Sequence, residues 1–131
     1  FELRIIMEGF CARLAAQRVT QAQLDRMENV LQELDQLQES DPQALMSIDR
    51  RFHRLLYTAA DNEFMTDILD RLYDLSLRLW YLVLNRLSEV KHSIEQHLIV
   101  LDALKEGDAD RAEAVIRKHI VEFQQSIKAA L

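Results

Sequence analysis

The stretch LMSIDRRFHRLLYTAA, residues 45–60, decides the fold of this chain, because its apolar side chains recur three and four positions apart, as on one helix face. Asp49 and His53 lie one helical turn apart, on or beside that apolar stripe and away from the arginines of the same stretch. A carboxylate buried there would cost several kcal/mol unless a positive group neutralised it. The sequence must therefore supply a partner for Asp49.

Residues that favour helix ends divide the rest of the chain. Thr20, Asp41 and Asp108 are candidate N-caps, and Pro42 suits the first position of a helix. Gly107 suits a helix C-terminus. These signals fall between stretches with helical spacing of apolar residues, so they mark the borders of successive helices.

The chain as a whole is predicted to be an all-α antiparallel bundle of six or seven helices. Its 131 residues suffice for one domain with a buried core, and they include only two glycines and one proline. The segment from Leu87 to His92 has no clear period and is predicted to be a loop. Helices are expected over residues 1–18, 20–40, 41–60, 64–86, 94–104 and 109–127.

Charge and composition narrow the class of protein. The net charge of −6 argues against nucleic-acid binding by this chain, since phosphate binding needs a basic face. The lone Cys11 excludes an internal disulfide and fits a reducing cytoplasm. No apolar run approaches the roughly 20 residues that cross a bilayer, so no membrane association is expected. The chain begins in helical pattern without a methionine, which predicts that an N-terminal portion is absent.

Histidines on apolar stripes are the second unusual feature. His53, His97 and His119 each fall between apolar residues, whereas His92 lies in the expected loop. Three imidazoles and the carboxylate of Asp49 form a donor set that suits Zn²⁺ and neighbouring transition metals. Periodicity alone leaves a metal site and a buried hydrogen-bond network equally open.

Sequence patterns of known enzymes are weak here. A di-iron site would need two Glu-x-x-His motifs, and only Glu89 to His92 matches, within the expected loop. The chain contains no His-Glu-x-x-His, no glycine-rich phosphate loop and no Gly-x-Ser-x-Gly. We therefore do not expect an enzyme.

Several short motifs, in order, resemble one known family. They are Glu2-Leu3-Arg4 with Glu8, Asp49-x-x-Phe52-His53, Ala59-Ala60-Asp61-Asn62, Glu95-Gln96-His97, Gly107-Asp108-Ala109 and Arg117-Lys118-His119. Together they resemble the effector-binding C-terminal (FCD) domain of the FadR subgroup of GntR-type bacterial transcription regulators, in its metal-containing branch.

The resemblance implies a metal site with an open position for a small carboxylate effector. Its ligands would be Asp49, His53, His97 and His119. Zinc is the expected metal, with nickel or manganese as alternatives.

The resemblance also places arginine near the effector. Arg4 matches the opening motif and could clamp a carboxylate, and Arg78 is a second candidate; for both, a salt bridge is the alternative. Asn62 could contact the effector, or could serve only a turn or helix cap.

The domain organisation follows from the same resemblance. Residues 1–131 would form an effector-binding and oligomerisation domain, active as a homodimer. DNA would be bound only through a winged helix-turn-helix domain N-terminal to this one. Two alternative functions are a mononuclear metalloenzyme acting on a small carboxylate and a purely structural helical dimerisation module.

Overall fold

The computed structural model describes residues 1–38 and 40–131, and within these ranges the secondary structure is helical throughout, with no strand. The predicted all-α fold of six or seven helices is confirmed, with seven α-helices and two short 3-10 helices in the described part. In chain order these are α1 (Glu2–Arg18), α2 (Gln21–Gln32), η1 (Glu33–Gln36), α3 (Pro42–Ala59), α4 (Glu63–Val83), η2 (Leu84–Arg86), α5 (Val90–Glu95), α6 (His97–Lys105) and α7 (Ala109–Ala130).

The helix borders follow the expected caps. Thr20 forms a capping box with Gln23, and the side chains of Asp41 and Asp108 accept hydrogen bonds from backbone N–H groups of the first turns of α3 and α7. Gly107 has a φ of 67°, the left-handed conformation that ends a helix at low steric cost.

Several borders differ from prediction. The segment from Leu87 to His92 is not entirely a loop, because α5 begins at Val90 and buries Val90 and Ile94. This single short helix is too brief for a period to be visible in the sequence. The second and fourth helices are also shorter than expected, since α2 ends at Gln32 and α4 at Val83, and a 3-10 turn follows each. The helix expected over 94–104 is divided between α5 and α6.

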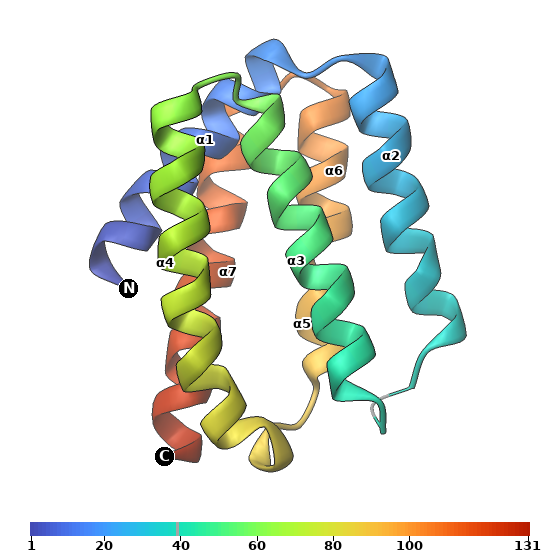
Figure 1. Ribbon diagram of the computed structural model, residues 1–131. Coiled ribbons are helices and arrows are strands. Elements are labelled where there is room, and N and C mark those ends of the chain that lie inside the picture. The colour runs from blue at the N-terminus through green and yellow to red at the C-terminus, as the bar shows by residue number, and fades with distance from the viewer. Residues whose placement is uncertain (39) are drawn as a thin grey trace.

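The helices form an antiparallel bundle, in which α1 and α7 lie side by side behind α3 and α4 (Figure 1). Small residues on α1 allow this close approach. At Gly9, an added Cβ would come within 2.7 Å of the Arg117 side chain, and Ala12 and Ala16 are also buried. No helix in residues 1–38 or 40–131 is long and apolar enough to cross a membrane.

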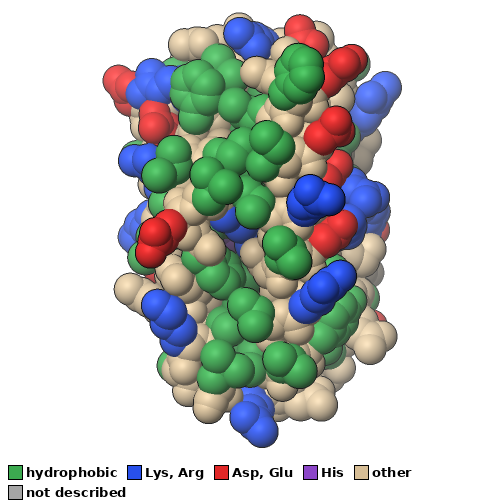
Figure 2. All heavy atoms as spheres, turned by 60° about the vertical axis from the view of Figure 1, so that its left-hand side comes forward, with side chains coloured by type: hydrophobic (Ala, Val, Ile, Leu, Met, Phe, Trp, Pro, Cys, Tyr) green, Lys and Arg blue, Asp and Glu red, His purple; other side chains and the backbone are tan. Residues whose placement is uncertain are grey.

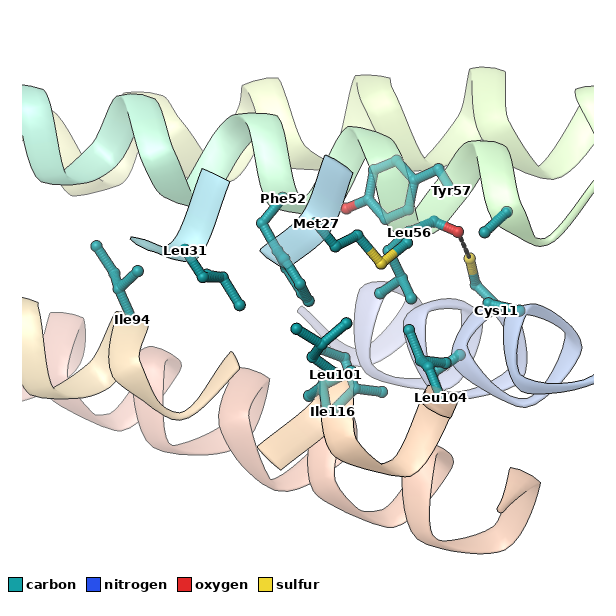
Figure 3. Close-up of a cluster of buried hydrophobic side chains, with 14 of the residues drawn as sticks. Cys11, Met27, Leu31, Phe52, Leu56, Tyr57, Ile94, Leu101, Leu104 and Ile116 are labelled. Carbon is teal, nitrogen blue, oxygen red and sulfur yellow. Dashed lines mark hydrogen bonds between the residues drawn. The ribbon is translucent and has the colours of Figure 1, made fainter. Parts of the chain in front are cut away.

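The apolar core takes buried side chains from all seven α-helices of the described part and extends to His97. Figure 3 shows Phe52 pointing from α3 toward Leu101 and Ile116, all buried in one cluster. On its other side the Phe52 ring stacks on His97, with centroids 4.6 Å apart. The apolar core therefore holds His97 in place for the polar cluster described below.

The cap of α4 offers a test of the fold. The Asn62 side chain accepts a hydrogen bond of 3.1 Å from the Met65 backbone N–H. We expect Asn62→Ala to lower the free energy of unfolding by about 1 kcal/mol, because that N–H loses its acceptor. Asn62→Ser should stay close to the unmodified protein, since serine also caps helices. Urea denaturation would check both; equal losses would contradict a capping role.

Candidate metal centre

Asp49, His53, His97 and His119 meet inside the bundle. Asp49 and His53 come from α3, His97 is the first residue of α6, and His119 lies on α7. One possible ligand atom from each lies within 4.8 Å of all the others, and all four side chains are buried. The structure thus brings together the four residues that the sequence analysis named as metal ligands.

Asp49 has three polar neighbours in this cluster. Its Oδ2 accepts a 2.6 Å hydrogen bond from the Tyr73 hydroxyl. Its Oδ1 lies 2.7 Å from His97 Nε2 and 3.5 Å from His53 Nε2. Burial alone would raise the pKa of Asp49, but His53 and His97 outweigh it and hold this pKa well below its usual value. Asp49 is therefore an anion in the protein interior.

Glu8 is a second buried carboxylate, behind His53. Its Oε2 lies 3.1 Å from His53 Nδ1, and its Oε1 accepts hydrogen bonds from Arg4 and from the Tyr57 hydroxyl. Burial opposes its charge, but His53 and Arg4 lower the pKa of Glu8 far below the usual value. With Nδ1–H bonded to Glu8, the Nε2 atom of His53 is left facing Asp49, the arrangement that orients metal-binding histidines.

The protonation of the three histidines differs. Burial disfavours the charge on His53, yet Glu8 and Asp49 raise its pKa to about 9. Burial lowers the pKa of His97 and, together with the neighbouring His97, lowers that of His119 further. His97 and His119 are therefore neutral at pH 7, the form in which imidazole binds a metal.

Ring nitrogens without partners distinguish the cluster from a closed hydrogen-bond network. Among the described residues, His53 Nε2, His97 Nδ1 and His119 Nδ1 are buried without a hydrogen-bond partner. Buried polar atoms normally have partners, and those that lack them often mark functional sites. A carboxylate and three imidazoles, with spare nitrogens, could hold a divalent transition metal.

The three predicted effector residues lie in different places. Arg4 is 3% exposed, and its guanidinium lies 5.1 Å from the centre of the Tyr73 ring, next to the cluster. Arg78 is exposed on α4, and Asn62 caps the same helix. Neither Arg78 nor Asn62 lines either of the two hollows beside the cluster, whereas Arg4 lines the smaller one.

Two hollows flank the cluster and share Asp49. The smaller, of about 10 Å³, has room for about one water molecule and is lined by Arg4, Tyr73 and His119, among others. The larger, of about 140 Å³, runs from the buried Asp49 and Trp80 to exposed residues at the bundle end. A small molecule could therefore reach Asp49 through the larger cavity.

Sequence analysis missed the structural importance of Glu8, Tyr57 and Tyr73. Glu8 entered only as part of the family motif, because glutamate is a residue type usually found at the surface. One signal was available: Arg4 and Glu8 are four residues apart, and so are His53 and Tyr57, which puts each pair on one helix face.

The buried ion pair of Arg4 and Glu8 predicts a large effect on stability. We expect Glu8→Gln to lower the free energy of unfolding of the metal-free protein by about 3 kcal/mol, because Arg4 and His53 lose their buried counter-charge. Glu33→Gln breaks the exposed pair with Arg51 and should cost less than about 1 kcal/mol. Urea denaturation with EDTA would measure both; similar losses would contradict the importance of the buried pair.

Comparison with known proteins gives a family match and curated relatives. Residues 1–122 match the family model of the FCD domain. The chain is 27% identical to the HTH-type transcriptional repressor RspR of Escherichia coli K12 over 127 residues, which is 96% of this chain and 56% of RspR. It is 26% identical to the HTH-type transcriptional regulator LutR of Bacillus subtilis over 130 residues, covering 94% of this chain and 58% of LutR. The chain thus spans a little over half the length of these relatives.

Solved structures share the fold at low identity. McbR/YncC of E. coli superposes with a TM-score of 0.84 and 15% identity, covering 98% of this chain and 62% of that one. The metal-free FCD domain of TM0439 gives a TM-score of 0.78 and 19% identity, covering 98% and 88%. The relatives above are named as transcriptional regulators and not as enzymes, as the sequence predicted. With 122 of its 131 residues matched, the chain belongs to the FCD domain family.

Proposed function

We propose that this chain is the effector-sensing domain of a bacterial transcription regulator. In this proposal Asp49, His53, His97 and His119 hold a divalent transition metal, and a small carboxylate binds beside it. The observation that carries the proposal is the buried cluster of these four residues, with unpartnered ring nitrogens and Arg4 next to it. Zinc suits the donor set best, and nickel or manganese are the alternatives.

Each residue around the site has a separate task in this proposal. Glu8 fixes His53 with Nε2 toward the cluster, and Tyr73 holds the second oxygen of Asp49. The metal would act as a Lewis acid toward a carboxylate oxygen of the effector. Arg4 lines the small hollow and offers N–H donors to the same carboxylate. Arg78 and Asn62 are less suited to this task where they lie.

Charge balance favours an anion as effector. Arg4 and Glu8 neutralise one another, and Asp49 contributes one negative charge. A divalent cation bound by neutral histidines leaves one positive charge in excess. Because uncompensated charge is unfavourable in a protein interior, a monocarboxylate would be the matching ligand.

DNA binding belongs to a different part of the parent protein in this proposal. The relatives RspR and LutR are named as HTH-type regulators, and this chain spans only a little over half of their length. The charge of −6 agrees with a chain that does not itself grip phosphates. We place a winged helix-turn-helix domain N-terminal to this one, in a protein of the bacterial cytoplasm. Effector binding would change its orientation by favouring one of two helix packings.

A homodimer through α1 and α4 completes the proposal. Figure 2 shows hydrophobic side chains gathered on one face of the molecule, the side of the bundle formed by α1 and α4. Such a continuous exposed apolar face is rare on monomers and typical of an interface. A second copy could cover it by two-fold symmetry. The exposed apolar residues of this face are Leu3, Ile6, Phe10, Phe64, Ile68, Leu75, Leu79 and Leu82.

Metal binding can be tested by thermal unfolding. We expect Zn²⁺ at about a hundredfold excess over its Kd to raise the Tm by about 10 °C, because it binds only the folded state. Lactate should then raise the Tm further in the metal-loaded protein and have no effect in EDTA.

Two variants on α7 serve as test and control. His119→Gln removes a ligand from the cluster and should abolish both stabilisations. Gln125→Ala changes an exposed residue of the same helix, outside the cluster and both hollows, and should keep both. The proposal would be wrong if the two variants responded alike, or if lactate stabilised the protein equally with and without metal.

The dimer face makes its own prediction. Leu75→Glu, on α4, should halve the mass measured by light scattering. A two-fold interface would then bury two carboxylates, one from each copy. Leu98→Glu, on α6, is the matched control, since Leu98 is 46% exposed and Leu75 49% exposed. It should leave the mass unchanged. A dimer that survives Leu75→Glu would exclude this face.

A further inference from the structure

We propose that the effector is a hydroxylated monocarboxylate of the sugar-acid class, and that Trp80 selects it by a hydrogen bond from its indole N–H. The inference rests on the proposed function, because it assumes that the carboxylate end binds beside Asp49 and Arg4. It concerns the other end of the ligand, which would occupy the larger cavity.

The size and depth of this cavity suit a chain-like molecule. Its volume of about 140 Å³ is roughly ten times the space that holds one water molecule. Asp49 and Trp80 are buried at one end, while Ser88, His92 and Ser126 are exposed at the other. A ligand with its carboxylate at the cluster would therefore extend toward the surface between α4, α5 and α7.

The cavity lining is unfavourable to a second carboxylate. Apart from Asp49, Glu89 and Glu122 line it, and its lining includes no lysine or arginine. A dicarboxylate or tricarboxylate would place its second anion near these two side chains. Arg4 lines the smaller hollow and not this cavity. The end of the site at the cluster thus accepts an anion, whereas the outer end of the cavity disfavours one.

The lining also requires a ligand group that both donates and accepts hydrogen bonds. Glu122 is an acceptor, and the hydroxyl of Ser93 and the amide of Gln96 can act both ways. Trp80 can only donate. It is fully buried, it lines the cavity, and its Nε1–H has no acceptor among the described residues. An ammonium group would satisfy Glu122 and leave Trp80 without a partner, whereas a hydroxyl can serve both.

A matched set of probes separates the possible tails. Four probes have the same chain length and a carboxylate at one end: gluconate, hexanoate, adipate and 6-aminohexanoate. The rest of gluconate carries hydroxyls, and that of hexanoate is an alkyl chain. Adipate ends in a second carboxylate, and 6-aminohexanoate ends in an ammonium group. Trp80 is the single tryptophan of the chain, so its fluorescence reports binding in this cavity directly. Titrations would use protein loaded with one equivalent of Zn²⁺. Calorimetry of gluconate with Zn²⁺ alone would correct for chelation.

We expect gluconate to bind at least about tenfold more tightly than the other three, the difference that one well-placed hydrogen bond can supply. In the Trp80→Phe variant, calorimetry should show that gluconate has lost most of its advantage over hexanoate. Hexanoate, adipate or 6-aminohexanoate binding as tightly as gluconate would overturn the inference, as would a Trp80→Phe variant that keeps the preference.

The outcomes distinguish this inference from the proposed function. If all four probes bind equally and only with metal, the carboxylate sensor stands and the sugar-acid inference is wrong. If none binds with metal, both are wrong. The comparison of the four probes in the unmodified protein decides the ligand class even if Trp80→Phe does not fold.

Discussion

A buried row of alternating charges is the constraint on which this structure depends. Arg4, Glu8, His53 and Asp49 follow one another at 3.1, 3.1 and 3.5 Å, and Tyr73 closes the row with a hydrogen bond to Asp49. In the low dielectric of the interior each charge is tolerable only because its neighbour has the opposite sign. The row joins α1, α3 and α4, so these helices must keep one register for all of the charges to be compensated.

The same row explains why a metal would be compatible with the folded protein. His53 is the cation between two carboxylates in the metal-free protein, as its pKa of about 9 indicates. A divalent ion at Asp49 would supply this positive charge instead, and His53 would lose one proton. Phe52 stacks on His97, so the core already holds this ring beside Asp49 in the metal-free protein.

Sequence reasoning found most of the fold because the signals were local. Caps such as Thr20 and Asp108 and the apolar stripe of α3 depend only on neighbours in the chain. The three inward histidines were visible for the same reason. What failed was the region of α5, where one short helix leaves too few apolar residues to show a period.

The burial of the charged residues of α1 could not be predicted from the sequence, for a different reason. Arg4 and Glu8 are residue types usually found at the surface, and only contacts with α3, distant in sequence, show that they are buried. The cavity lined by Trp80 was equally unpredictable, because it forms where residues from α3, α4, α5 and α7 fail to fill the space between them. Non-local packing, unlike periodicity, leaves no record in a single sequence.

Helix α1 has two faces with different neighbours, and this has a thermodynamic consequence. Its inner face carries Arg4 and Glu8, while Leu3, Ile6 and Phe10 are exposed on the proposed dimer face. A stiff helix of 17 residues cannot shift on one side without shifting on the other. Linkage is reciprocal, so the factor by which the effector changes the affinity of the dimer is also the factor by which dimer assembly changes the affinity for the effector. The concentration of the protein would then help to set the effector level at which it responds.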